Sequence, residues 1–187
     1  MTLPTGELGE AMLGAARSVR HGVNNQMMVL RGNLDLLARG AAEGSPAARQ
    51  IARAQEAADR LAAVLGAYLA LARDRGVAKV KPGPALAALL PLLETAGGGS
   101  VALQGDAEGV VSWPRPELPV ALLRWALEAE AARGAGDPPP NLALQVTSGP
   151  QGLSVRPEPP PGQAAGFAAA AAAAGGIWDG ATLRLPG

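Results

Sequence analysis

The sequence predicts an α + α/β fold, with a helical hairpin over residues 1–76 and an α/β domain over residues 77–187. The distribution of proline indicates the hairpin. Of 17 prolines, only Pro46 lies between Pro4 and Pro82, and a helix interior tolerates proline poorly. Apolar residues in this stretch also repeat at intervals of three and four. After residue 76 glycine and proline become frequent and short strand-like runs alternate with helical ones, which is typical of α/β layers.

The hairpin is expected to consist of helices near residues 6–40 and 46–75. Gly40 and Gly44 suit a helix end. Ser45 is a candidate N-cap, and Pro46 suits the first position of the next helix. Thr5 is a candidate cap for the first helix. Because no further proline occurs before residue 82, the second helix could extend as far as residue 81.

Each helix carries an apolar repeat, and a single hairpin cannot bury both repeats. The simplest remedy is a homodimer in which two hairpins form a four-helix bundle. The repeat in the first helix contains a stutter, two successive intervals of four, which locally unwinds a supercoil. Its members are Ala16, Val19, Val23, Met27, Leu30, Leu34 and Leu37, and those of the second helix are Ile51, Ala54, Ala58, Leu61, Leu65, Tyr68 and Ala72.

The second domain is predicted to alternate short helices and strands. We expect helices over 85–96, 117–133 and 164–174. Strands are expected over 101–104, 109–113, 141–147 and 152–156, with a closing strand pair around 176–185. The stretch 157–162 contains too much proline for either regular element.

Composition excludes several classes of protein. The formal net charge is zero, so neither a nucleic-acid surface nor a polybasic membrane surface is expected. The chain has no cysteine and one histidine, which rules out disulfides and a metal cluster built on histidines. The alanine run 168–174 is too short to span a bilayer, and no signal peptide is evident. A cytoplasmic protein is therefore expected.

His21, the one histidine, lies on the first helix, roughly opposite the apolar repeat, and should be exposed. Arg17, Asn25 and Met28 share its face. Gly14, Gly22 and Gly32 lie near the same side, where they could let the backbone of another protein come close. Neutral imidazole is a good nucleophile near pH 7, and Arg17 could partly neutralise a phosphoryl group. On this pattern alone, a lone exposed histidine is more often an ordinary surface residue.

The residues around His21 favour a functional role over that of an ordinary surface residue. The segment 21–37, HGVNNQMMVLRGNLDLL, resembles the phosphoacceptor box of histidine kinases. Many of those boxes contain histidine, an acid, two asparagines, an apolar run, Gly-Asn-Leu, an acid and two leucines. The resemblance implies a dimerisation and histidine-phosphotransfer domain with His21 as phosphoacceptor.

The second domain resembles the ATP-binding domain of the same family in a degenerate form. Residues 120–131 resemble the helix with the magnesium-binding asparagine, but Glu128 stands in its place. Residues 153–157 resemble the strand before the adenine-binding aspartate, and here Pro157 replaces it. Residues 166–168 are a poor remnant of the glycine-rich box, and the mobile ATP lid is missing. Residues 175–178 and 182–186 resemble the closing strands of the family.

These departures imply phosphotransfer without kinase activity. Gly22 replaces the acid that follows the histidine in kinases and can act as general base. Without the metal ligand, the adenine-binding carboxylate and the lid, no ATP binding or other cofactor is expected. The arrangement is similar to ChpT-like phosphotransferases and to sporulation phosphotransferase B, whose partners are response-regulator receiver domains that supply the Mg²⁺ and the aspartate. Met28, Gly22 and Arg17 would contact the receiver.

Two other functions remain open. Asn25 lies four residues after His21, where kinases with phosphatase activity place a residue that orients water. The protein could therefore be a response-regulator phosphatase. It could also be a non-catalytic docking inhibitor of a kinase or a receiver, in which case His21 would be dispensable.

Overall fold

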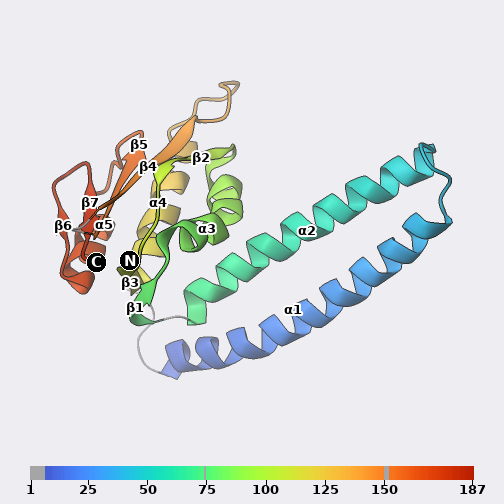
Figure 1. Ribbon diagram of the computed structural model, residues 1–187, viewed down its shortest axis with the longest axis horizontal. Coiled ribbons are helices and arrows are strands. Elements are labelled where there is room, and N and C mark those ends of the chain that lie inside the picture. The colour runs from blue at the N-terminus through green and yellow to red at the C-terminus, as the bar shows by residue number, and fades with distance from the viewer. Residues whose placement is uncertain (1–6, 74, 150–151) are drawn as a thin grey trace. The chain divides into compact units, whose positions relative to one another are not determined.

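The computed structural model describes the backbone of residues 7–73, 75–149 and 152–187, and the side chains of these residues except 7–17 and 72–73. The chain divides into two compact units, Met1–Arg73 and Asp74–Gly187. This division falls three residues before the boundary expected from the sequence. Figure 1 shows a helical hairpin as the first unit and helices packed on β-sheet as the second.

The first unit consists of α1 (Glu7–Gly40) and α2 (Pro46–Arg73). The turn between them has the expected features. Gly44 adopts a left-handed backbone with φ of 71°, which glycine reaches without steric cost. Ser45 is the N-cap, since the backbone N–H of Ala48 donates to its Oγ at 3.1 Å. The predicted cap Thr5 lies outside the described residues.

The apolar repeat of the hairpin separates into two sets. One set, which we call the seam, lies between the helices: Met27 and Ala58 are buried and Val23, Leu34, Ile51 and Leu65 are half-buried. The second set is exposed, with 41% to 58% of each side chain accessible. It consists of Val19, Leu30, Leu37, Leu61 and Tyr68.

The described residues of the second unit form two sheets and three helices. A five-stranded sheet has the order β2-β4-β5-β7-β6, in which only β2 and β4 are parallel. A two-stranded antiparallel sheet joins β1 to β3. The helices cover one face of the larger sheet (Figure 1). The strands are β1 (Gly76–Val80), β2 (Val101–Asp106), β3 (Val111–Arg115), β4 (Leu142–Gly149), β5 (Gly152–Glu158), β6 (Ile177–Trp178) and β7 (Leu183–Leu185). The helices are α3 (Pro82–Gly97), α4 (Glu117–Ala131) and α5 (Ala165–Ala174).

Alternation along the central strands determines which face of the larger sheet is buried. On β4, Leu144 and Val146 are buried, whereas Gln145 and Thr147 are exposed. Successive side chains of a strand point to opposite faces, so the apolar set contacts the helices and the polar set faces solvent. The largest fully buried side chains in this unit include Trp125 and Phe167. Each helix and strand expected after residue 82 is present, with ends displaced by a few residues.

The second helix ends at Arg73, close to the expected end at residue 75. No strand was predicted over residues 76–80, which form β1 because Val77 and its neighbours pair with β3. One expectation was wrong. Pro157 lies inside β5, where no regular element was expected beyond residue 156. β7 pairs with β5 only over Leu153–Val155. At Pro157 the strand therefore has a neighbour on one side only, a position at which the missing N–H of proline is tolerated.

Candidate functional site

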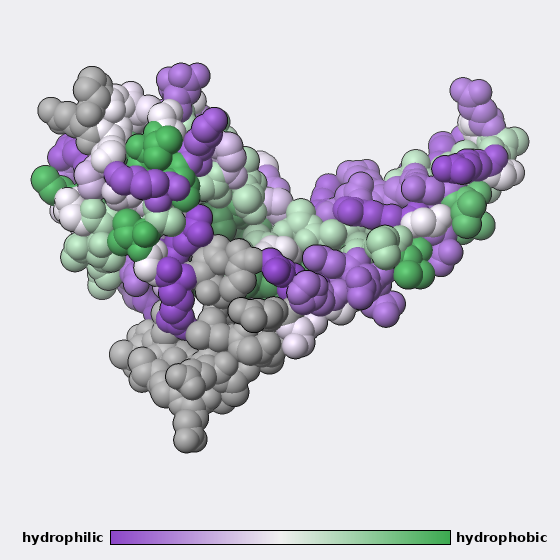
Figure 2. Space-filling view, turned by 60° about the horizontal axis from the view of Figure 1, so that its bottom comes forward, coloured by the Kyte–Doolittle hydropathy of each residue, from purple (hydrophilic) through white to green (hydrophobic). Residues whose placement is uncertain are grey.

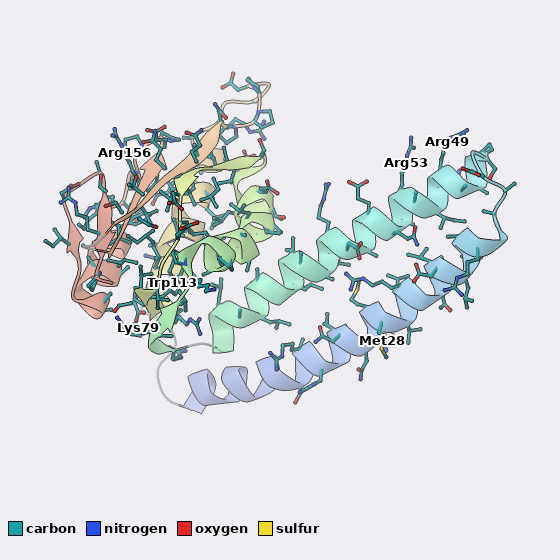
Figure 3. All side chains as sticks on the ribbon, in the orientation of Figure 1. Met28, Arg49, Arg53, Lys79, Trp113 and Arg156 are labelled. Carbon is teal, nitrogen blue, oxygen red and sulfur yellow. The ribbon has the colours of Figure 1, made fainter. Side chains whose placement is uncertain are left out.

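His21 lies on an exposed row of side chains along the outer surface of α1. His21, Asn25, Met28, Gly32 and Leu36 follow one another at intervals of three and four, and all are exposed. We call this row the His21 ridge. Met28 is 68% and Leu36 is 66% accessible, and Met28 points away from α2 (Figure 3). Along the hairpin surface, apolar and polar side chains are interspersed (Figure 2). The ridge thus presents an imidazole beside apolar groups that no described part of the chain covers.

Polar contacts between the helices define one side of the hairpin. Arg31 Nη2 lies 2.6 Å from Asp59 Oδ1, and Gln55 Nε2 donates to Asp35 Oδ1 at 2.8 Å. Residues seven apart lie on the same face of an α-helix because seven residues make about two turns. His21 is two such steps before Asp35, with Met28 between them. The ridge therefore borders this polar side.

The exposed apolar set lies on the other side of the hairpin. Leu30 and Leu61 each follow a seam residue by three positions, and so do Leu37 and Tyr68. In an antiparallel pair, the same rotational offset from the seam brings residues of both helices to one side. Leu30, Leu37, Leu61 and Tyr68 therefore lie on one side of the hairpin, which we call the apolar side, away from His21.

Two glycines of the first helix make no packing contact with the described residues at the position of a Cβ. A Cβ built on Gly22 or on Gly32 meets no heavy atom within 4 Å. Glycine in a helix interior costs about 0.8–1.0 kcal/mol relative to alanine, and nothing in the described hairpin compensates for that cost. The open space above both residues could accommodate a partner. Gly14 and the predicted contact Arg17 belong to the part of α1 whose side chains are not described.

In the second unit, Glu128 holds a loop instead of a metal. Its Oε2 accepts hydrogen bonds from the backbone N–H groups of Gly162 and Gln163, at 3.1 and 3.2 Å. One turn earlier on α4, Trp125 Nε1 donates to the carbonyl of Pro159 at 2.7 Å. We call residues 159–163 the strap. Two side chains of α4 therefore fasten both ends of the strap.

The strap leads into α5, which packs directly on α4. A Cβ on Gly166 would lie 3.3 Å from Ala121 Cβ and 3.4 Å from its Cα, so glycine allows the two helices their close approach. Pro157, where the family would place an adenine-binding carboxylate, is buried in β5. Among the described residues, no three His, Cys, Asp or Glu side chains are grouped so that they could hold a metal ion.

Sequence reasoning missed the contacts of Glu128. The resemblance identifies this residue only as a replacement for a metal-binding asparagine. No local signal pointed to these contacts. Glu128 accepts from Gly162 and Gln163, which precede the N-cap Ala164, so their N–H groups are not among those that a helix start leaves without acceptors.

No family model matches the sequence, and no curated protein matches it either. One similar solved structure is the crystal structure of full-length ShkA in complex with AMPPNP, with a TM-score of 0.40 and 17% sequence identity. The alignment covers 94% of this chain and 44% of ShkA, so the chain spans less than half of that protein. No helix in the described ranges is long and apolar enough to cross a membrane.

Proposed function

We propose that this chain is a homodimeric histidine phosphotransferase that passes phosphoryl groups between receiver-domain aspartates through His21. One observation carries the proposal. The only histidine lies within a segment that resembles a phosphoacceptor box, and it is exposed on a ridge that borders the polar side of the hairpin. A nucleophile for phosphotransfer must be accessible to a second protein. The exposed position of His21 therefore supports its role as phosphoacceptor.

In the proposed reaction, a nitrogen of neutral His21 attacks the phosphorus of a receiver aspartyl phosphate. The N–P bond forms while the bond from phosphorus to the aspartyl oxygen breaks, and the carboxylate leaves with the electron pair. The imidazole N–H proton passes to solvent. The reverse sequence loads a second receiver. The receiver's Mg²⁺ would neutralise the charge that develops on the phosphoryl oxygens, so the chain needs no metal of its own.

The dimer would form through the apolar side of the hairpin. Burying one Leu is worth roughly 1.5–3 kcal/mol, and Leu30, Leu37 and Leu61 are each about half accessible in the single chain. Pairing two hairpins through this side would cover those residues and leave both His21 ridges free. A dimer through the polar side would instead separate Arg31 and Asp59 from water and restrict access to His21.

A kinase reaction with ATP is disfavoured by the second unit. The carboxylate at the position of the metal ligand is occupied by the strap, and α4 and α5 are in direct contact beside it. We expect no ATP binding at micromolar concentration. Titration calorimetry with Mg-ATP tests this, and a micromolar dissociation constant would contradict it.

The reaction can be tested first without a protein partner. Phosphoramidate transfers a phosphoryl group directly to accessible imidazoles, so wild-type protein should gain one acid-labile phosphate per chain and His21→Ala none. The labelled protein is then mixed with purified receiver domains from the same organism. Transfer of label to a receiver aspartate is expected. Stable phosphohistidine in the presence of every receiver would contradict the proposal.

The phosphatase alternative is tested by Asn25, which is exposed one turn after His21. A phosphorylated receiver is mixed with Asn25→Ala, with His21→Ala and with Asn33→Ala, an exposed asparagine off the ridge, as the matched control. Loss of receiver phosphate that requires His21 supports transfer. Loss that requires Asn25 but not His21 identifies a phosphatase. If neither residue matters and signalling is still suppressed, the protein is a docking inhibitor.

A further inference from the structure

Two consecutive methionines of α1 lie in opposite environments. Met27 is in the seam and is 8% accessible, whereas Met28 is on the His21 ridge and is 68% accessible. The chain contains no cysteine, so no thiol competes for an oxidant. Accessible thioethers react with peroxides, and the product is the polar sulfoxide. The sequence thus places a reactive sulfur and a protected one side by side.

We propose that Met28 is a peroxide-sensitive modification site that controls docking at the His21 ridge. The effect on docking rests on the phosphotransfer function proposed above, whereas the selectivity of oxidation does not. In the reaction, the Met28 sulfur attacks one oxygen of a hydroperoxide and the O–O bond breaks. Sulfur gains the oxygen and is oxidised by two electrons, and the remaining oxygen leaves as water or an alcohol after taking up a proton.

The position of Met28 makes this change relevant to transfer. Met28 lies seven residues after His21, about 10 Å along the helix axis, within the area that a docked receiver would cover. An apolar side chain there can contact the receiver without any hydrogen bond. A sulfoxide in the same place carries a strong acceptor, which must lose water on docking. We expect receiver affinity to fall about tenfold.

Dimerisation would leave the site accessible. Met28 borders the polar side of the hairpin, whereas the exposed apolar residues Leu30, Leu37, Leu61 and Tyr68 lie on the other side. Covering that side protects none of the atoms around Met28. Met27, by contrast, is already covered by α2 and stays in the seam. The difference between the two sulfurs should therefore persist in the assembled protein.

The test treats the full-length protein with hydrogen peroxide and maps oxidation by peptide mass spectrometry. Met28 should form sulfoxide at least about tenfold faster than Met27. Each protein is then assayed for transfer from phosphorylated receiver before and after peroxide. The transfer ratio is the rate after peroxide divided by the rate before it. The ratio should fall for wild type and for Met27→Leu. It should stay near one for Met28→Leu, whatever the starting rate of that variant.

Three results would overturn the inference. The first is equal oxidation of Met27 and Met28. The second is an unchanged transfer ratio in wild type once Met28 is fully oxidised. The third is a ratio that falls as much in Met28→Leu as in wild type. If untreated wild type transfers no phosphate at all, the proposed function fails instead, and the peptide map still decides whether Met28 is the modification site.

Discussion

Replacing Gly32 by alanine should make the hairpin more stable and the protein a weaker receiver partner. A Cβ at Gly32 meets no heavy atom within 4 Å, so the new methyl group causes no clash within the chain. Alanine is favoured over glycine inside a helix by about 0.8–1.0 kcal/mol. Exchange of the α1 amide hydrogens around residue 32 should therefore slow by about fivefold, since 1.4 kcal/mol corresponds to a factor of ten.

The same Gly32→Ala substitution that stabilises the hairpin should weaken receiver binding. If a receiver packs its backbone against Gly32, an inserted methyl group overpacks that contact, which typically costs about 1–3 kcal/mol. We expect the receiver dissociation constant to rise by about tenfold, measured by titration with a non-phosphorylated receiver. Gly40→Ala is the matched control, because its Cβ also meets nothing within 4 Å and it lies far along α1 from His21. A Gly32→Ala protein with slower exchange and unchanged receiver affinity would refute the reasoning.

Three more predictions concern assembly, the strap and pH. Leu37→Lys should convert the proposed dimer to a monomer at micromolar concentration in sedimentation, while helix content is retained; a persistent dimer would place the interface elsewhere. Glu128→Ala should cost about 1 kcal/mol of unfolding free energy, because the strap loses its acceptor, and should speed exchange of the Gly162 amide. An unchanged exchange rate would show that the carboxylate does not hold the strap. The backbone N–H of Thr182, followed by that of Ala181 and the Arg184 charge, lowers the pKa of Asp179. The charged form of Asp179 therefore stabilises the fold above the ordinary aspartate pKa of 3.8, and this stabilisation is lost as pH falls through the lowered pKa. Fluorescence of adjacent Trp178 should report the loss in wild type but not in Asp179→Asn.

The hairpin was largely predictable because local signals determine it. Ser45 and Pro46 mark the start of α2 with side-chain chemistry that acts within one turn. The repeat also indicated more apolar surface than one hairpin can bury, which agrees with the exposure of Leu30 and Leu61. Its separation into a seam and an exposed set was not predicted, because both sets follow the same spacing of three and four. Only the packing of α1 against α2 distinguishes them.

The errors in the second unit arise from interactions between distant residues. Gly76 disfavours a continued helix, but the strand conformation of residues 76–80 depends on pairing with β3, more than thirty residues later. Pro157 is tolerated because β7 is short, which the local sequence around the proline does not encode. The contacts of Glu128 with Gly162 and Gln163 likewise join residues 34 and 35 positions apart. Local propensity cannot report on such pairs.

The close approach of α4 and α5 affects how far point substitutions can change the second unit. Replacing Glu128 by asparagine and Pro157 by aspartate would introduce the side chains that the resemblance associates with nucleotide. It would not separate the two helices, which meet at Gly166 and Ala121. A phosphate-binding cavity there would require α5 to move outward and its buried Phe167 to leave the core. Side-chain exchange alone is therefore insufficient, and an engineered nucleotide site would have to begin with a longer connection between β5 and α5.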